Sequence, residues 1–257
     1  MSDPLLRVDA LRAGHPGHAP VGPVTLSLAR GDIVAVLGPN GVGKTTLFRT
    51  LIGALPALAG GAAWQGVDAR SMTHRQRGLC AAWVPQRPTA AFDLTVAQYV
   101  QLGSLSSVGP LRAPGPAARQ AADAALGRLG LSALRDRAVG RLSGGERQLV
   151  ALARALAQQA SVLLLDEPAA SLDFSNRDRV LQVLASLAAE GFAVMFSTHD
   201  PNDALRIAGA VLLMGRGKAP VFGPTDRIAR PESLSIAYGA RLQEAVASDG
   251  RRVITSA

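Results

Sequence analysis

Short, mainly apolar runs recur along the chain and predict buried strands. They lie at residues 33–37, 81–84, 162–165, 193–197 and 211–214. Because these runs are apolar at consecutive positions, both faces of the strands should be covered, as in a parallel sheet with helices on either side. Residues 5–30 instead alternate apolar and polar side chains, which predicts edge strands leading to a turn. A further short strand is expected at residues 62–66.

Helical patterns separate these runs. The stretch at 147–158 is amphipathic, since Leu149, Leu152 and Leu156 recur on one side of a helix. Residues 70–77 are polar and predict an exposed helix with a solvated face. Other helices are expected at residues 46–52, 117–129 and about 177–190. Together these elements predict an α/β fold with a mostly parallel sheet.

The segment between the first apolar run and its helix carries the strongest chemical pattern. The phosphate-loop pattern G-x-x-x-x-G-K-[ST], with one more threonine behind it, is met by Gly38, Pro39, Asn40, Gly41, Val42, Gly43, Lys44, Thr45 and Thr46. Its glycines let successive N–H groups point inward, and the following helix presents its positive end to the same place. Lys44 can then reach the β- and γ-phosphates of a nucleotide, and the Thr45 hydroxyl can coordinate Mg²⁺.

The lysine count supports the same interpretation. Lys44 and Lys218 are the only lysines among 27 basic residues, so this chain uses arginine almost everywhere for positive charge. A phosphate cradle is one place where a planar guanidinium does not replace a compact ammonium. A glycine-rich turn that matches the pattern by chance would not explain the position of Lys44.

Polar side chains also follow three other predicted strands. Gln86 comes after the second apolar run, Asp166 and Glu167 come after the third, and His199 follows the fourth. Ligand contacts tend to fall at the carboxyl ends of parallel strands, so we expect these side chains to face one site. An acidic pair beside a phosphate loop fits Mg²⁺ binding and activation of a water, whereas an ordinary Asp-Glu-Pro turn is the alternative.

Two further loops are candidates for the site. Ser143, Gly144 and Gly145 start the amphipathic helix and form a second anion-binding helix end. In the loop at residues 14–18, His15 and its neighbour three residues on could ligate a metal, but no carboxylate or cysteine stands beside them. We therefore interpret this loop as one that lies near the nucleotide.

Composition and charge narrow the function classes. The 257 residues can form one large α/β domain with a small insertion. There is no apolar stretch as long as a membrane span and no signal-peptide pattern at residues 1–4, so we expect the protein to stay in the cytosol. The net charge of +8 comes from scattered arginines, so no nucleic acid is expected as a partner. The single cysteine, Cys80, predicts a buried structural thiol.

Taken in order, these segments resemble the ATP-binding subunit of ABC transporters over essentially the whole chain. The phosphate loop corresponds to the Walker A motif, residues 162–167 to Walker B, and residues 142–146 to the signature motif. Gln86 corresponds to the Q-loop glutamine, residues 171–173 to the D-loop, and His199 to the switch histidine. The resemblance implies a phosphate-loop NTPase core with an antiparallel β subdomain and a helical insertion that carries the signature.

The domain organisation follows from this resemblance and from residues 87–142, where prolines punctuate helical stretches. We expect a single ABC ATPase domain over residues 1–257. Its parts would be a nucleotide-binding core with the β subdomain (1–86 and 156–225), a helical subdomain (87–155) and a C-terminal tail (226–257).

The resemblance also implies a head-to-tail homodimer with two ATP molecules between its subunits. Each ATP would sit on residues 38–46 of one chain and be closed by residues 143–145 of the other. The implied roles are Mg²⁺ binding by Thr45, Gln86 and Asp166, polarisation of the attacking water by Glu167, steadying of the γ-phosphate and water by His199, and coupling of the two sites by Asp173. Family members usually stack an aromatic ring on adenine from the early loop, and His15 is the nearest candidate here.

The resemblance is most specific to importers of iron-siderophores, haem or cobalamin, because of residues 94–96 and the tail at 234–239. Importers of zinc or manganese have similar tails. Such a subunit works at the cytoplasmic face of the inner membrane with integral-membrane permease subunits and, indirectly, a solute-binding protein.

Two other function classes stay open. A non-transport ABC ATPase acting on ribosomes or DNA usually has tandem ATPase units or long coiled coils, and the chain has one set of motifs and no sustained heptad between Lys44 and Asp166. A nucleotide-binding module without turnover is disfavoured by the presence of Glu167 and His199.

Overall fold

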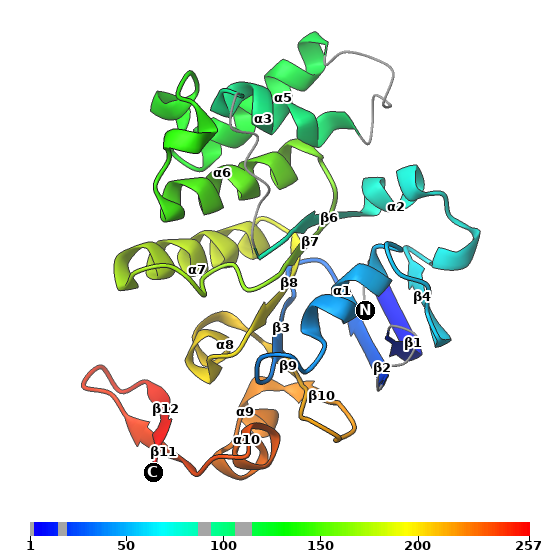
Figure 1. Cartoon of the computed structure of the whole chain (residues 1–257), viewed down its shortest axis with the longest axis vertical. Coiled ribbons are helices and arrows are strands. Elements are labelled where there is room, and N and C mark those ends of the chain that lie inside the picture. Colours follow the sequence, from blue (N-terminus) through cyan, green and yellow to red (C-terminus); the bar gives the residue numbers. More distant parts are fainter. Residues whose placement is uncertain (1–2, 15–19, 87–93, 106–114) are drawn as a thin grey trace.

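A six-stranded sheet forms the centre of the computed structural model, which describes residues 3–14, 20–86, 94–105 and 115–257 (Figure 1). The strand order is β10-β9-β3-β8-β7-β6, and every neighbouring pair is parallel except β9 with β10. The strands are β3 (Ile33–Leu37), β6 (Ala81–Val84), β7 (Val162–Leu165), β8 (Ala193–Thr198), β9 (Ala210–Leu213) and β10 (Val221–Pro224). The expectation of a mostly parallel sheet built from the apolar runs is confirmed.

Both faces of this sheet are buried, which explains why its strands are apolar at consecutive positions. Along β3, Val34 and Val36 join one apolar cluster, whereas Ala35 and Leu37 join the other. The first cluster contains Phe48 from the helix after the phosphate loop. The sheet therefore separates two cores, and side chains that alternate along one strand contribute to both.

A second, antiparallel sheet covers one side and has the order β2-β1-β4-β5. Its strands are β1 (Leu6–Ala13), β2 (Val21–Leu28), β4 (Ala59–Trp64) and β5 (Val67–Asp68). Of the two strands expected at the edge, only β2 is an edge strand, because β4 pairs with the free side of β1. Alternation reports that one face of a strand is buried, but it does not report how many neighbours the strand has.

The helices lie in two groups on opposite sides of the central sheet (Figure 1). The helix after the phosphate loop, α1, packs between the two sheets. The other face of the central sheet is covered by helices from the middle of the chain, of which α6 and α7 run beside it. In chain order up to residue 207, the described α-helices are α1 (Lys44–Leu51), α2 (His74–Cys80), α3 (Val96–Gln101), α5 (Pro116–Arg128), α6 (Gly144–Ala157), α7 (Phe174–Ala189) and α8 (Pro201–Ile207).

Capping residues explain where the observed helices differ from the expected ones. The helix expected at 70–77 is two pieces, a 3-10 turn at Ala69–Ser71 and then α2, because Thr73 caps α2 in a capping box with Gln76. In α6 the amphipathic pattern begins at residue 147, but the helix itself starts at Gly144 with Ser143 as its cap, which agrees with the expected helix start at residues 143–145. Further 3-10 turns lie at Leu102–Ser104, Ser132–Leu134 and Val139–Arg141.

The C-terminal residues, expected only as a mixed tail, form a defined set of elements. These are α9 (Thr225–Ile228), α10 (Pro231–Tyr238) and the hairpin of β11 (Leu242–Val246) with β12 (Arg252–Ser256). The hairpin is tied to α8 by Asn202, whose side chain donates to the Ile254 carbonyl at 3.0 Å and accepts from the Ile254 amide at 2.8 Å. The tail is thus attached to the helix that follows His199.

Two expectations from composition can be compared with the fold. Cys80 is a free, buried thiol, as expected, and burial raises its pKa. Among the helices in the described ranges, none has the length and hydropathy that crossing a membrane requires.

Candidate nucleotide site

The phosphate loop connects the end of β3 to the start of α1 and depends on glycine at two places. A side chain at Gly38 would place its Cβ 2.3 Å from the Met214 carbonyl oxygen. Gly43 has φ +104°, and a Cβ there would lie 2.2 Å from Cγ2 of Val21. Gly43 is also the cap of α1, so the unpaired N–H groups of the first helical turn face the loop. This is the backbone geometry that an anion-binding loop needs.

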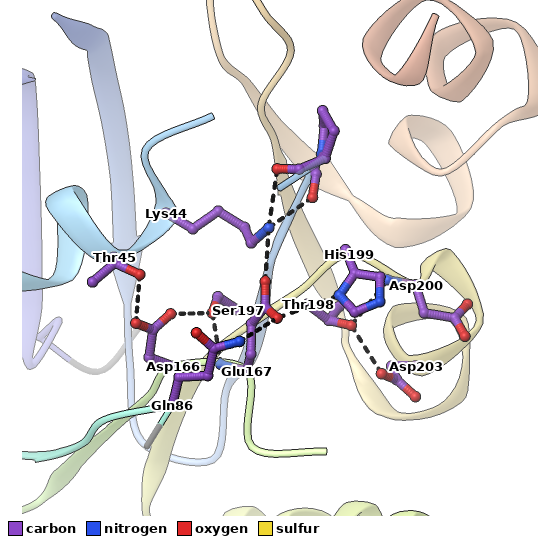
Figure 2. Close-up of polar contacts among 12 residues, drawn as sticks. Lys44, Thr45, Gln86, Asp166, Glu167, Ser197, Thr198, His199, Asp200 and Asp203 are labelled. Atoms are coloured by element: carbon purple, nitrogen blue, oxygen red, sulfur yellow. Dashed lines mark hydrogen bonds and ion pairs between the residues drawn. The ribbon is translucent and has the colours of Figure 1, made fainter. Parts of the chain in front are cut away.

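Lys44 lies inside this loop with its side chain 5% exposed. Its Nζ donates to the carbonyl oxygens of Gly38 at 2.8 Å and Pro39 at 3.2 Å, and it pairs with Oε1 of Glu167 at 3.0 Å (Figure 2). The ammonium thus spans the loop and reaches the acidic end of β7. A polyphosphate on the loop would compete with Glu167 for this cation.

Asp166 is the buried member of the acidic pair and is 2% exposed. Its Oδ2 accepts from the Thr45 hydroxyl at 2.6 Å, and its Oδ1 accepts from the Ser197 hydroxyl at 2.7 Å. The Thr45 hydroxyl and the Asp166 carboxylate are oxygen donors, and the Gln86 side chain, whose Nε2 donates to Glu167 at 3.0 Å, carries a further amide oxygen; such oxygen donors are what Mg²⁺ prefers. The residues present therefore fit this cation.

Glu167 contacts three other side chains of the site (Figure 2). Its Oε2 accepts from Gln86 Nε2 at 3.0 Å and lies 3.3 Å from His199 Nδ1, while its other oxygen pairs with Lys44. Its backbone is held by a bond from its N–H to the Ser197 hydroxyl at 2.8 Å, and it has φ +46°, an uncommon value for a residue other than glycine. Of the strand-end residues expected to face one site, Glu167 thus contacts both Gln86 and His199, and Asp166 precedes it in the chain.

A charged cluster lies behind His199 and fixes the loop that carries it. Arg177, from α7, pairs with Asp200 and with Asp203. Asp203 also accepts from the Thr198 hydroxyl at 2.8 Å, and Asp200 caps α8. Burial raises the pKa of Asp203, and the hydrogen bond and charge of Arg177 oppose this rise. This ion pair joins α7 to the His199 loop.

Sequence reasoning missed several residues of this network. Ser197 could have been found, since it is a hydroxyl at the end of an apolar strand, as Gln86 and Asp166 are polar side chains at strand ends. Arg177 and Asp203 give no such signal, because their partners are set only by the packing of α7 on α8.

The signature residues lie on a different part of the molecule from Lys44. Ser143 caps α6 and Asp173 caps α7, and the two helix starts approach so closely that a Cβ on Gly145 would lie 2.5 Å from the Asn176 side chain. Within the described ranges, no hydrogen bond or ion pair joins Ser143 or Asp173 to the phosphate loop. A cavity of about 260 Å³ is nevertheless lined by both Gly144 and Glu167.

For the early loop the expectation is a contact with the nucleotide, with metal ligation by its histidines as the alternative. His15, expected near adenine, falls outside the described residues. In the part of the chain that is described, no group of three or more His, Cys, Asp or Glu could hold a metal ion.

Comparison with known proteins agrees with this geometry. The family model described as ABC transporter matches residues 21–170, more than half of the chain. The hemin import ATP-binding protein of Gloeobacter violaceus is 36% identical over 223 residues, which are 84% of this chain and 80% of that protein. The manganese transport system ATP-binding protein of Bacillus subtilis is 33% identical over 221 residues, 85% of this chain and 86% of that protein.

A solved structure extends the similarity to nearly the full length. It is an inward-facing ABC transporter, described as of a metal-chelate type, and it superimposes with a TM-score of 0.88 at 30% identity. The match covers 99% of this chain and 98% of that chain, so it includes the C-terminal elements that lie beyond the family model. The phosphate loop, the acidic strand end and these similarities together establish that the chain belongs to the ATP-binding subunits of ABC transporters.

Proposed function

We propose that the chain hydrolyses ATP to ADP and phosphate and that this reaction drives an ABC importer. The observation that carries the hydrolysis is the position of Glu167, whose carboxylate is in reach of Lys44, Gln86 and His199 at the edge of the sheet. Phosphoryl transfer to water needs positioning and charge neutralisation more than covalent chemistry, and these four side chains supply both.

We propose the residue roles that the resemblance implies, and the contacts of Lys44, Thr45 and Glu167 support them. Residues 38–46 would hold the phosphates through backbone N–H groups, with Lys44 on the β- and γ-phosphates and Thr46 beside them. Thr45, Gln86 and Asp166 would hold Mg²⁺, which neutralises charge on the phosphates. Glu167 would accept a hydrogen bond from the attacking water and draw its proton, while His199 steadies the water and the γ-phosphate. His15 is proposed to stack on adenine.

We also propose that two copies of the chain close on two ATP molecules. Ser143, Gly144 and Gly145 of one subunit would cover the phosphates held by the other, and Asp173 would couple the two sites. Support comes from the absence of bonds between these residues and the phosphate loop of their own chain, within the described ranges, and from their placement at helix N-termini. In the proposed division into a core (1–86 and 156–225), a helical subdomain (87–155) and a tail (226–257), the two halves of each site belong to different parts.

The proposed cargo is an iron-siderophore, haem or cobalamin. The similarity to the hemin import protein and to the metal-chelate type transporter supports this choice. The manganese transport relative supports the alternative of a zinc or manganese importer. In either case the proposed partners are integral-membrane permease subunits and, through them, a solute-binding protein, with this chain at the cytoplasmic face of the inner membrane.

The test of hydrolysis and dimer closure uses Glu167→Gln. We expect vanadate-sensitive ATP hydrolysis by the wild-type chain, loss of that activity in the variant, and ATP-dependent dimers of the variant in size-exclusion chromatography. A wild-type chain with no ATPase activity, alone or with its membrane partners, would refute the proposal. Purification of a tagged chain from its own cells separates the importer from a non-transport ATPase, because only the importer brings permease subunits with it.

A further inference from the structure

Tyr238 brings the C-terminal tail to the edge of the nucleotide site. It is the last residue of α10, and its hydroxyl donates to the carbonyl oxygen of His199 at 2.8 Å. Helix α10 packs close to the residues that follow β9, since a Cβ on Gly215 would lie 3.1 Å from Cα of Ala237. The carbonyl of the preceding residue, Met214, is the one that approaches Gly38. Tyr238 thus reaches His199 from a helix that packs close to Gly215, just after the end of β9.

The His199 ring has few contacts of its own, so its placement depends on how the His199 backbone is held. Its side chain is 43% exposed, so packing does not fix it. Within the described part of the chain, the ring makes one polar contact, at 3.3 Å to Glu167. The backbone therefore sets the point from which the ring projects, and the Tyr238 hydroxyl bonds to that backbone at His199 itself.

A second contact joins the C-terminal tail to the residues that follow His199. Asn202, three residues after His199, exchanges two hydrogen bonds with the backbone of Ile254 in the C-terminal hairpin. On the other side, Arg177 pairs with Asp200. Residues 199–202, where the chain passes from β8 into α8, are thus held between α7 and the tail, and Tyr238 supplies the bond nearest to the ring.

The Tyr238 hydroxyl is suited to act as a permanent donor. Burial raises its pKa, and the nearby carboxylates of Asp200 and Glu167 raise it further. The phenol therefore keeps its proton, and can donate it in a hydrogen bond, to a higher pH than an exposed tyrosine.

We propose that Tyr238 is a positioning residue of the ATPase: it holds the His199 carbonyl so that the imidazole faces Glu167 and the γ-phosphate. This inference rests on the proposed function of His199. It makes the C-terminal tail part of the ATPase mechanism, although the Tyr238 hydroxyl bonds to a backbone carbonyl and not to a catalytic side chain.

The chain offers a matched pair of variants, because it has only two tyrosines. Tyr238→Phe keeps the ring and removes the hydroxyl that bonds to His199. Tyr99→Phe removes a buried hydroxyl that bonds to no residue in the described ranges. We expect kcat for ATP hydrolysis to fall about three- to tenfold in Tyr238→Phe, as for the loss of one hydrogen bond, with KM for ATP within about twofold of wild type. Tyr99→Phe should match the wild type in both constants.

A double-mutant cycle separates positioning of His199 from a general structural effect. If Tyr238 acts through His199, adding Tyr238→Phe to His199→Ala causes no further loss of kcat. A full additional loss in the double variant, or a wild-type kcat in Tyr238→Phe, would overturn the inference.

A readout without ATP distinguishes this inference from the proposed function. Hydrogen exchange of the backbone amides at residues 198–200 and 202 should be faster in Tyr238→Phe than in the wild type and unchanged in Tyr99→Phe. Equal exchange in all three proteins would overturn the inference even if the wild type hydrolyses ATP. Absence of hydrolysis by the wild type, with faster exchange in Tyr238→Phe, would instead remove the proposed function and leave the anchor in place.

Discussion

The ion pair between Lys44 and Glu167 leads to a prediction about nucleotide affinity. The two groups are 3.0 Å apart, and their side chains are 5% and 9% exposed. A triphosphate that binds Lys44 must displace this carboxylate and also tolerate its negative charge nearby. Glu167→Gln keeps the shape of the side chain and removes the charge. We therefore expect the variant to bind ATP more tightly than the wild type.

The size of the effect can be estimated from the distance. Two unit charges 3.0 Å apart attract by about 5–6 kcal/mol at an effective dielectric constant of about 20. Desolvation of the two groups offsets most of this attraction, and Lys44 keeps its bonds to the Gly38 and Pro39 carbonyls in either case. A net gain of about 1–2 kcal/mol, or about 5- to 30-fold in Kd, is the expected result.

The assay is equilibrium binding of a non-hydrolysable ATP analogue, measured by calorimetry at protein concentrations where the chain is monomeric. The gain should be smaller for ADP, which lacks the γ-phosphate that competes for Lys44. Glu190→Gln is the control. Glu190 follows the last residue of α7, far from Lys44, and pairs with Arg128, so this substitution should leave the affinity for the analogue unchanged. Affinity for the analogue that is equal to or weaker than that of the wild type would show that the ion pair does not oppose nucleotide binding.

Other substitutions should separate stability from function. Gly43→Ala should lower the free energy of unfolding by about 1–3 kcal/mol in urea titration, since φ is +104° there, and Val21→Ala should restore only the steric part. Phe48→Ala, at a fully buried position, should cost about 3–5 kcal/mol by the same measurement. Above about pH 10, Tyr238 should lower the free energy of unfolding by about 1.4 kcal/mol per pH unit. The reason is that Tyr238 ionises in the unfolded chain, whereas its raised pKa keeps it neutral in the folded chain. Tyr238→Phe should lack this contribution to the dependence of stability on pH. Cys80, buried and with a raised pKa, should react with a thiol reagent at neutral pH only after denaturation.

The central sheet and the composition of the site could be predicted from the sequence because one physical rule governs both. A run that is apolar at consecutive positions forms a strand buried on both faces, and a polar residue directly after it lies at the sheet edge. This rule predicts that Gln86, Asp166, Glu167 and His199 lie together, and contacts of Glu167 with Gln86 and with His199 are observed.

Contacts that depend on packing between distant elements could not be predicted in the same way. The position of β1 between two neighbours requires β4, whose residues 59–63 are only alanine and glycine and give a weak strand signal. The pairing of Lys44 with Glu167 depends on rotamers inside the site. The bond from Tyr238 to His199 joins residues 39 positions apart through the path of the tail, which has no periodicity that fixes it.

The position of the helical region has a consequence for how this type of subunit can diversify. Everything between residues 84 and 162 is one connection that leaves β6 and returns to β7, and these strands are direct neighbours in the sheet. Its start and finish are fixed by that pairing, while its interior length is not. Segments there that lie away from Gln86 and from residues 143–145 can be exchanged or lengthened without moving β6 or β7.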